Sequence, residues 1–147
     1  MSKTITFTVP GVRGKARPRF ARNGRIYTPS DTVKYEQSVA AAFREKCRYM
    51  PFDEGEPLRI SITAHFDRPQ RATRIQRQMM AAGMIRPTKK PDGDNICKAV
   101  WDGLSGVAFY DDAQVVEGSV SKVYCKDGEE AHIEVTVESL AAERTKE

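Results

Sequence analysis

Apolar and polar residues alternate in several short stretches of the chain, the pattern of strands with one buried face. Residues 4–9 (TITFTV) and 58–66 (LRISITAHF) show it, and so do residues 114–124 and 131–137. The last two segments are joined through Lys126-Asp127-Gly128, a turn sequence, which predicts that they form an antiparallel hairpin. About four strands are therefore expected.

Two other stretches carry a helical period. The first runs from residue 30 to about residue 49, where Ser30 or Asp31 could cap its start. The second opens at the sequence PDGDN and ends near Leu104. On a helical wheel its apolar residues form one stripe, predicted to be buried: Ile96, Cys97, Val100 and Leu104. Three charged residues lie on the opposite side: Asp94, Lys98 and Asp102.

The order of these elements predicts an α+β fold, with two main helices packed on a small mixed sheet. We expect residues 1–147 to form a single domain, because this length suits one core. Within it, residues 13–25 form a basic loop or a ribbon that turns at Asn23-Gly24. Residues 67–90 are polar, and both a short exposed helix at 73–82 and a mobile loop are compatible with them. Residues 141–147 are expected to fray.

Composition narrows the class of protein. Of the 147 residues, 39% are hydrophobic and 30% are charged, and no apolar run has the roughly 18 residues needed to span a bilayer. The N-terminus lacks the apolar stretch of a signal peptide. The 3 cysteines are odd in number and widely spaced, which argues against a disulfide framework and for a cytoplasmic protein.

Charge is divided unequally along the chain. Residues 1–90 hold 19 Lys and Arg against 7 Asp and Glu, whereas residues 91–147 hold 5 against 13. This division suggests a surface for a polyanion beside a cluster of carboxylates, although solvated charge that happens to segregate explains it equally well. Six of the cations lie between Arg13 and Arg25, with no acid among them.

The acidic residues that carry most information are Asp92, Asp94 and the pair Asp111-Asp112. Helix capping and an Asp94–Lys98 ion pair would account for the first two. They account less well for a second acidic pair at the start of the next strand, where Asp is disfavoured. If that strand returns beside the helix, three carboxylates converge and need a cation. Oxygen ligands alone favour Mg²⁺ or Mn²⁺.

Other catalytic chemistries find little support. His65 and His132 lie in strand-like segments and are expected to be structural residues rather than bases. No Ser or Cys has a recognisable nucleophilic setting, and no glycine-rich phosphate loop is present.

Residues 90–115, KPDGDNICKAVWDGLSGVAFYDDAQV, resemble the signature of the RusA family of Holliday junction resolvases, found in bacteria and their prophages. The basic start, GKARPRF and then YTPSDTVKYE, is also similar to that family, and residues 67–88 are the least similar. The resemblance implies a homodimeric, Mg²⁺-dependent endonuclease that cuts two opposed strands of a four-way junction.

Carried over by motif, three aspartates would be metal ligands: Asp92, Asp94 and Asp112. Lys98 would be a catalytic cation, and Asp111 is a reserve candidate for the ligand role. Two glycines depart from the pattern: Gly93 stands where a larger residue is common, and Gly103 where many members have Ala, a change expected to weaken the helix by ~1 kcal/mol.

The expected function is therefore Mg²⁺-dependent resolution of four-way DNA junctions in recombination and repair. Five cations are expected to contact DNA phosphates: Lys15, Arg17, Arg19, Lys89 and Lys90. Two alternatives stay open: a non-catalytic nucleic-acid-binding module, and a flap or fork nuclease without preference for junctions.

Overall fold

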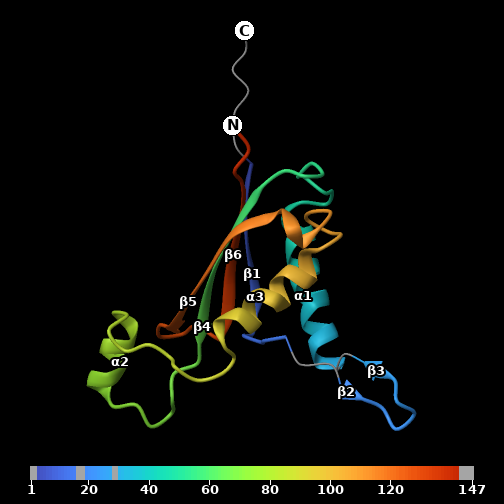
Figure 1. The fold of residues 1–147 in the computed structure, drawn as a ribbon. Coiled ribbons are helices and arrows are strands. Elements are labelled where there is room, and N and C mark those ends of the chain that lie inside the picture. Colours follow the sequence, from blue (N-terminus) through green and yellow to red (C-terminus); the bar gives the residue numbers. More distant parts are fainter. Residues whose placement is uncertain (1–2, 16–18, 28–29, 143–147) are drawn as a thin grey trace.

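The computed structural model describes residues 3–15, 19–27 and 30–142. Figure 1 shows the arrangement of its helices and strands. In chain order they are β1 (Thr4–Pro10), β2 (Arg19–Phe20), β3 (Ile26–Tyr27), α1 (Ser30–Lys46), β4 (Leu58–Phe66), α2 (Arg74–Ala81), α3 (Gly93–Leu104), η1 (Asp112–Gln114, a 3₁₀ helix), β5 (Val115–Tyr124) and β6 (His132–Ser139).

The main sheet is mixed, with strand order β1-β6-β4-β5. β6 runs antiparallel to both of its neighbours, whereas β5 runs parallel to β4. The fold is therefore α+β, as predicted. A parallel pair needs a crossover connection, and here α2 and α3 lie in the connection from β4 to β5.

The predicted hairpin between residues 114–124 and 131–137 is wrong, because β4 lies between β5 and β6. After β5 the chain passes the end of β4, where the Cys125 amide donates to the Phe66 carbonyl and the Ala131 amide donates to Asp67 Oδ1. β4 buries every second residue and suits a central position, while β5 has no fully buried residue and suits an edge.

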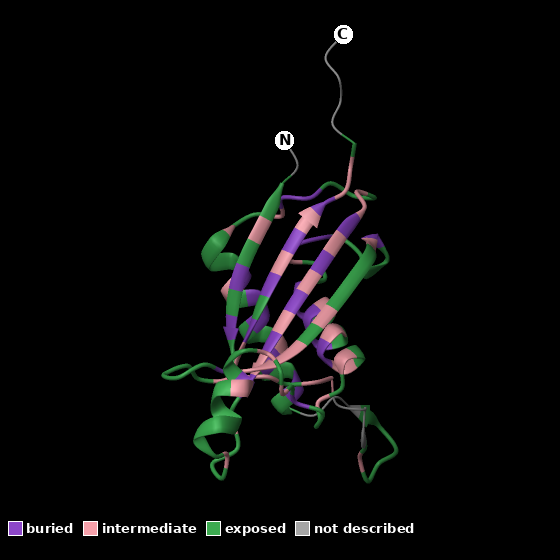
Figure 2. Ribbon diagram, turned by 90° about the vertical axis from the view of Figure 1, so that its left-hand side faces the viewer, coloured by how far each residue is buried: buried purple, intermediate pink, exposed green. Residues whose placement is uncertain are grey.

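Helices α1 and α3 cover one face of the sheet and leave the other face open (Figures 1 and 2). Phe7 from β1 and Phe43 from α1 meet edge to face in the core between the layers, with ring centroids 5.7 Å apart. The two helices approach closely at Gly103, where a Cβ would lie 2.9 Å from both the Glu36 carbonyl oxygen and Val39 Cβ. The absence of a side chain at Gly103 therefore serves helix packing.

Most of the other predicted elements are confirmed. β4 spans the predicted residues 58–66, α3 covers the predicted second helix, and α1 ends at Lys46, earlier than expected. The exposed helix considered for residues 73–82 is present as α2, so a third helix joins the two main ones. The basic segment does turn at Asn23-Gly24, between the short paired strands β2 and β3. Of the tail expected to fray, residues 143–147 lie outside the described residues.

None of the helices in the described part of the chain has the length and apolar content needed to cross a bilayer.

Candidate active site at the start of helix α3

Asp92 is the N-cap residue of α3, with extended backbone angles (φ −69°, ψ 155°). An aspartate at this position normally accepts a hydrogen bond from the first turn, but the Asp92 side chain makes no such bond. Helix capping, the structural role considered for this residue, is thus not performed by its carboxylate. The side chain is exposed.

Asp94 and Lys98 follow on the exposed side of the same helix, as the helical wheel predicts. Within the described residues no ion pair within 4.0 Å joins them or involves either one, so the i,i+4 pair considered as a structural explanation is not formed. The buried stripe is also confirmed: Ile96, Val100 and Leu104 are fully buried, and Cys97 is half-buried. The start of α3 therefore presents two carboxylates and one ammonium group that have no ion-pair partner in the described part of the chain.

The segment after β1 packs tightly against this end of the helix. A Cβ on Gly14 would lie 2.8 Å from Pro91 Cβ, and the Lys15 amide donates to the Asn95 carbonyl at 2.9 Å. Between the two segments lies a shallow hollow of about 380 Å³, lined in part by Asp92, Arg13 and Lys90. A neighbouring hollow of about 370 Å³ adds Lys89. The two hollows share Arg13, Lys90 and Pro91, so a carboxylate and several cations line adjacent surface at the start of α3.

Lys15 is engaged elsewhere. Its Nζ lies 2.6 Å from Glu36 Oε1 and 3.0 Å from Asp102 Oδ2, which ties the basic segment to both α1 and α3. Burial disfavours the charge of Lys15, but the hydrogen bonds to Glu36 and Asp102 outweigh it and raise the pKa of the amine. Contact of Lys15 with phosphate stays a prediction, and it would require the loss of these ion pairs.

Two of the other predicted DNA contacts cannot be placed. Arg17 lies outside the described residues, and of Arg19 only the backbone, in β2, is described. Lys89 and Lys90 are exposed, directly before Asp92.

The second acidic pair lies at the other end of α3, and it does not begin a strand as predicted. Asp111 caps the 3₁₀ helix η1, accepting a hydrogen bond from the Ala113 amide at 2.9 Å, and Asp112 is the first residue of η1. The buried Gln114 accepts from the Tyr110 and Asp111 amides and donates to the Asp53 and Glu56 carbonyls. Much of the motif D-D-x-Q-V is therefore structural.

The carboxylates at this end interact with one another. The Ala113 amide lowers the pKa of Asp111, and a hydrogen bond with Asp112 acts in the same direction. That hydrogen bond raises the pKa of Asp112, and the negative charges of Asp111 and Asp102 add to the effect. A hollow of about 520 Å³, larger than those near Asp92, adjoins Asp111 but contains none of the unpaired groups of the other end.

Asp92, Asp94 and Asp112 do not converge within one chain. Asp102, whose charge acts on Asp112, lies eight residues after Asp94, which is about 12 Å along the helix axis. Among the described residues, the one group of three potential metal-ligating side chains within 4.8 Å is a different one: His65, His132 and Glu134.

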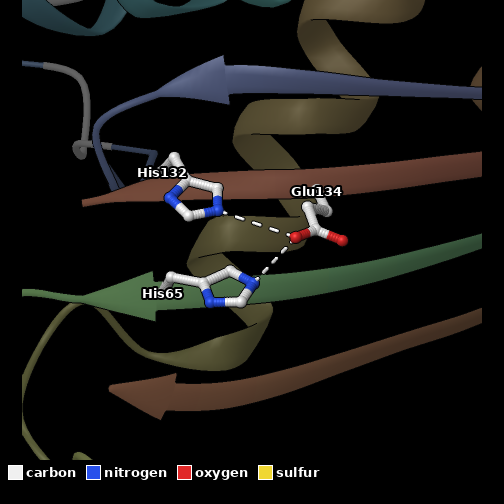
Figure 3. Close-up of side chains that lie close together, drawn as sticks. All are labelled: His65, His132 and Glu134. Carbon is white, nitrogen blue, oxygen red and sulfur yellow. Dashed lines mark ion pairs between the residues drawn. The ribbon is translucent and has the colours of Figure 1, made fainter. Parts of the chain in front are cut away.

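This histidine cluster lies on the open face of the sheet and was missed by sequence reasoning, because the pairing of β4 with β6 creates it (Figure 3). The Nε2 atoms of His65 and His132 lie 3.2 and 3.6 Å from Glu134 Oε1. Burial lowers the pKa of His65, and the charge of His132 adds to this effect. However, the rings are stacked, with centroids 4.2 Å apart and planes 10° from parallel. Since a metal ion binds in the plane of an imidazole, one ion cannot join both rings as they stand.

Comparison with known proteins gives two matches. Residues 10–138 match the family described as "Endodeoxyribonuclease RusA". The chain is also similar to the "Uncharacterized protein YqaN" of Bacillus subtilis (strain 168), with 33% identity over 144 residues that cover 94% of this chain and 98% of that protein.

Proposed function

Because the chain belongs to the RusA family of endodeoxyribonucleases, we propose that it is a Mg²⁺-dependent nuclease that resolves four-way DNA junctions by paired cuts. The observation that carries this proposal is the start of α3, where Asp92, Asp94 and Lys98 are exposed and none has a charged partner among the described residues. Exposed charges of both signs beside a basic depression suit a metal ion together with a phosphate.

In this proposal Asp92 and Asp94 hold the metal ion, and their hard oxygen donors fit Mg²⁺ or Mn²⁺. Bound there, the ion would supply an activated water and stabilise charge on the phosphate. The ammonium group of Lys98, one turn after Asp94, neutralises charge that develops on the phosphate or the leaving oxygen. Lys89 and Lys90, with Arg17 and Arg19, hold the DNA backbone, and such contacts carry no sequence information.

Asp112 is the third proposed ligand, and within one chain it lies at the far end of α3. It would therefore reach the metal from a second copy of the chain. A homodimer also presents two sites related by a twofold axis, which suits two symmetrical cuts in a four-way junction. The process served would be recombination or repair of cytoplasmic DNA, in a bacterium or its prophage.

The test is cleavage of synthetic DNA by the full chain in Mg²⁺. A four-way junction, a replication fork, a flap and a linear duplex of the same sequence are compared, with EDTA as the metal-free control. Junctions cut in two opposed strands, faster than forks and flaps, support the proposal. Equal cutting of forks and flaps supports a nuclease without junction preference, and binding without any cutting supports a non-catalytic module.

A further inference from the structure

The segment between β4 and α3 is unusually basic. Residues 68–90, which we name the α2 arm, contain 7 Lys and Arg and no Asp or Glu. Figure 1 shows that the arm projects from the body at the end of the sheet where α3 begins, on the opposite side from β2 and β3. The arm leads without interruption into Pro91 and Asp92.

The arm is a built structure and not a loose loop. Thr73 and Gln76 form a capping box at the start of α2: the Gln76 amide donates to Thr73 Oγ1 at 3.1 Å, and the Thr73 amide donates to Gln76 Oε1 at 2.9 Å. Met80 is the one buried residue of α2, with 7% of its surface exposed. At the far end of the arm, Lys122 of β5 donates to the Lys89 carbonyl.

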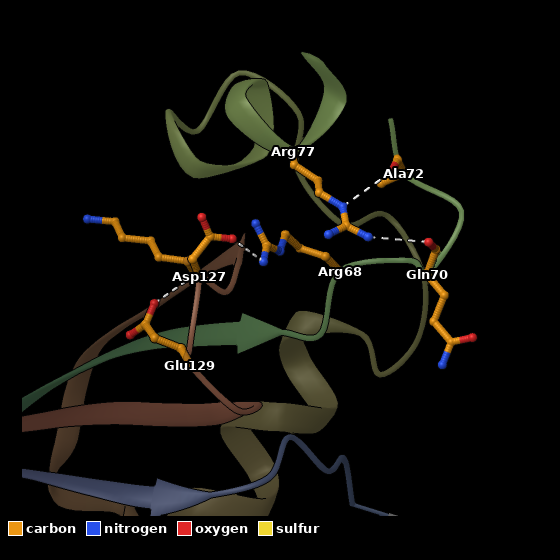
Figure 4. Close-up of polar contacts among 7 residues, drawn as sticks. Arg68, Gln70, Ala72, Arg77, Asp127 and Glu129 are labelled. Carbon is orange, nitrogen blue, oxygen red and sulfur yellow. Dashed lines mark hydrogen bonds and ion pairs between the residues drawn. The ribbon is translucent and has the colours of Figure 1, made fainter. Parts of the chain in front are cut away.

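Two of the arginines are used within the protein, as Figure 4 shows. Arg68 forms an ion pair with Asp127, in the turn between β5 and β6. Arg77 donates from Nε to the Ala72 carbonyl at 3.2 Å and from Nη2 to the Gln70 carbonyl at 3.4 Å, which braces the loop before α2. These two side chains fix the shape of the arm.

The other arginines of the arm make no such contacts among the described residues. Arg71, Arg74 and Arg86 are exposed, and no side-chain hydrogen bond or ion pair involves them within the described part of the chain. Lys89 and Lys90, at the end of the arm, are exposed as well. With no acid in the arm, like charges repel one another until an anionic partner lies against them. The density of positive charge suits a polyanion.

We propose that the α2 arm holds the phosphate backbone of one DNA arm through Arg71, Arg74 and Arg86, and guides it to Asp92. The inference rests on the proposed function and adds a contact surface outside the five cations already assigned. Two apolar side chains of the arm, Ile75 and Met84, are 69% and 72% exposed and could instead meet another protein. The free cations outnumber them, so the charge of the arm favours a polyanion over an apolar protein surface.

The experiment measures binding of a fluorescent four-way junction by anisotropy in EDTA, between 50 and 200 mM salt, so that cleavage plays no part. The test variant is Arg71→Gln with Arg74→Gln. The matched control is Arg44→Gln with Arg48→Gln, which removes two exposed charges at the other end of α1 from β3. A second variant, Arg71→Lys with Arg74→Lys, keeps the charge. Thermal melts check that all of them fold.

The inference expects the Gln variant of the arm to flatten the slope of log K against log salt by roughly two and to weaken binding about tenfold or more. The Lys variant should restore most of the slope, and the control should keep the wild-type slope. An unchanged slope in the arm variant, or an equal loss in the control, overturns the inference. So does a change in oligomeric state, seen by ultracentrifugation, with the slope unchanged, since the arm would then be a protein interface.

These outcomes are distinguishable from failure of the proposed function. If the wild-type chain cuts junctions in Mg²⁺ while the arm variant binds with the wild-type slope, only the arm inference fails. If the wild-type chain neither binds nor cuts junctions, both fail.

Discussion

The two ends of helix α3 carry the same residue type in different roles. At its start, Asp92 makes no capping hydrogen bond and Asp94 forms no ion pair with any described residue. At its end, Asp102 pairs with Lys15, and Asp111 caps η1, where the Ala113 amide lowers the pKa of its carboxyl group. Acids at the second end mostly have structural partners, whereas those at the first end have no ion-pair or capping partner among the described residues.

The difference shows how to separate structural aspartates from candidate metal ligands within one acidic motif: the candidates are those whose carboxylates have no hydrogen bond or ion pair among the described residues. Within 21 residues, from Asp92 to Asp112, the sequence shows five aspartates that all look like candidates for one site. Hydrogen bonds divide them into residues that hold the fold and residues free for chemistry. Asp112 belongs to neither group clearly, since its side chain is exposed but the neighbouring Asp111 raises its pKa.

Mixing two inactive variants tests whether the two ends act together across a dimer. Asp94→Asn and Asp112→Asn chains should each be inactive, but co-refolded together they should regain cleavage. In such a heterodimer one site combines an intact Asp94 from one copy with an intact Asp112 from the other. The measurement is nicking of a four-way junction in Mg²⁺, with each variant refolded alone as control. No recovery in the mixture would mean that Asp112 does not act between copies.

Lys98 should matter to rate and not to stability. Lys98→Ala is expected to lower the cleavage rate by at least ~10²-fold, because it removes a cation that stabilises charge in the transition state. Since no ion pair with another described residue holds Lys98, the melting temperature should hardly change. Lys46→Ala, an exposed cation at the end of α1, is the matched control. A Lys98→Ala protein that melts lower but cuts normally would assign the residue to the fold.

Lys15, in contrast to Lys98, should matter to the stability of the fold. Its side chain is 23% exposed and bridges Glu36 and Asp102, so Lys15→Met leaves two carboxylates without their partner. We expect a loss of about 1–3 kcal/mol in the free energy of unfolding, measured by urea denaturation. Lys98→Met should lose less than about 0.5 kcal/mol. Equal losses in the two variants would remove the contrast between the ends of α3.

The smallest effect concerns the titration of Asp111 and Asp112. Carboxyl NMR should find the pKa of Asp111 below the ordinary value of 3.8 and that of Asp112 above it. Because its pKa is lowered in the folded state, Asp111 adds folding stability that is lost as the pH falls through the folded pKa. Because its pKa is raised, Asp112 adds folding stability only at low pH, and this contribution is lost as the pH rises through the folded pKa. Asp111→Asn keeps the cap and should lower the pKa of Asp112. An unchanged value would show that Asp111 does not raise the pKa of Asp112.

Local patterns were sufficient to predict most elements but not their order in the sheet. Alternation predicts β4 at residues 58–66, and a helical period with a buried stripe predicts α3. Alternation says which residues face the core but not which strands are neighbours, so the hairpin of β5 with β6 was wrong. Gly103 illustrates the same limit: its lack of a side chain reflects contact with α1, which no local pattern reveals.

The candidate site likewise has features that the sequence predicts and features that depend on the tertiary fold. The helical wheel places Asp94 and Lys98 on the exposed side, because that depends on the helix alone. The engagement of Lys15 with Glu36 and Asp102, and the stacking of His65 on His132, depend on segments distant in sequence. Convergence of Asp112 with Asp92 and Asp94 is also a tertiary matter, and a single chain does not produce it. Their roles as metal ligands stay predictions.

One pair of variants on the same helix tests the central claim most directly. Asp94→Asn and Asp102→Asn each remove one carboxylate from the exposed side of α3, and the cleavage rate of a four-way junction is measured in Mg²⁺. The account predicts that Asp94→Asn loses at least about a hundredfold in rate while still binding the junction, whereas Asp102→Asn cuts at close to the wild-type rate. Normal cutting by Asp94→Asn, with loss of cutting in a folded Asp102→Asn protein, would place the active site at the other end of the helix and contradict the account.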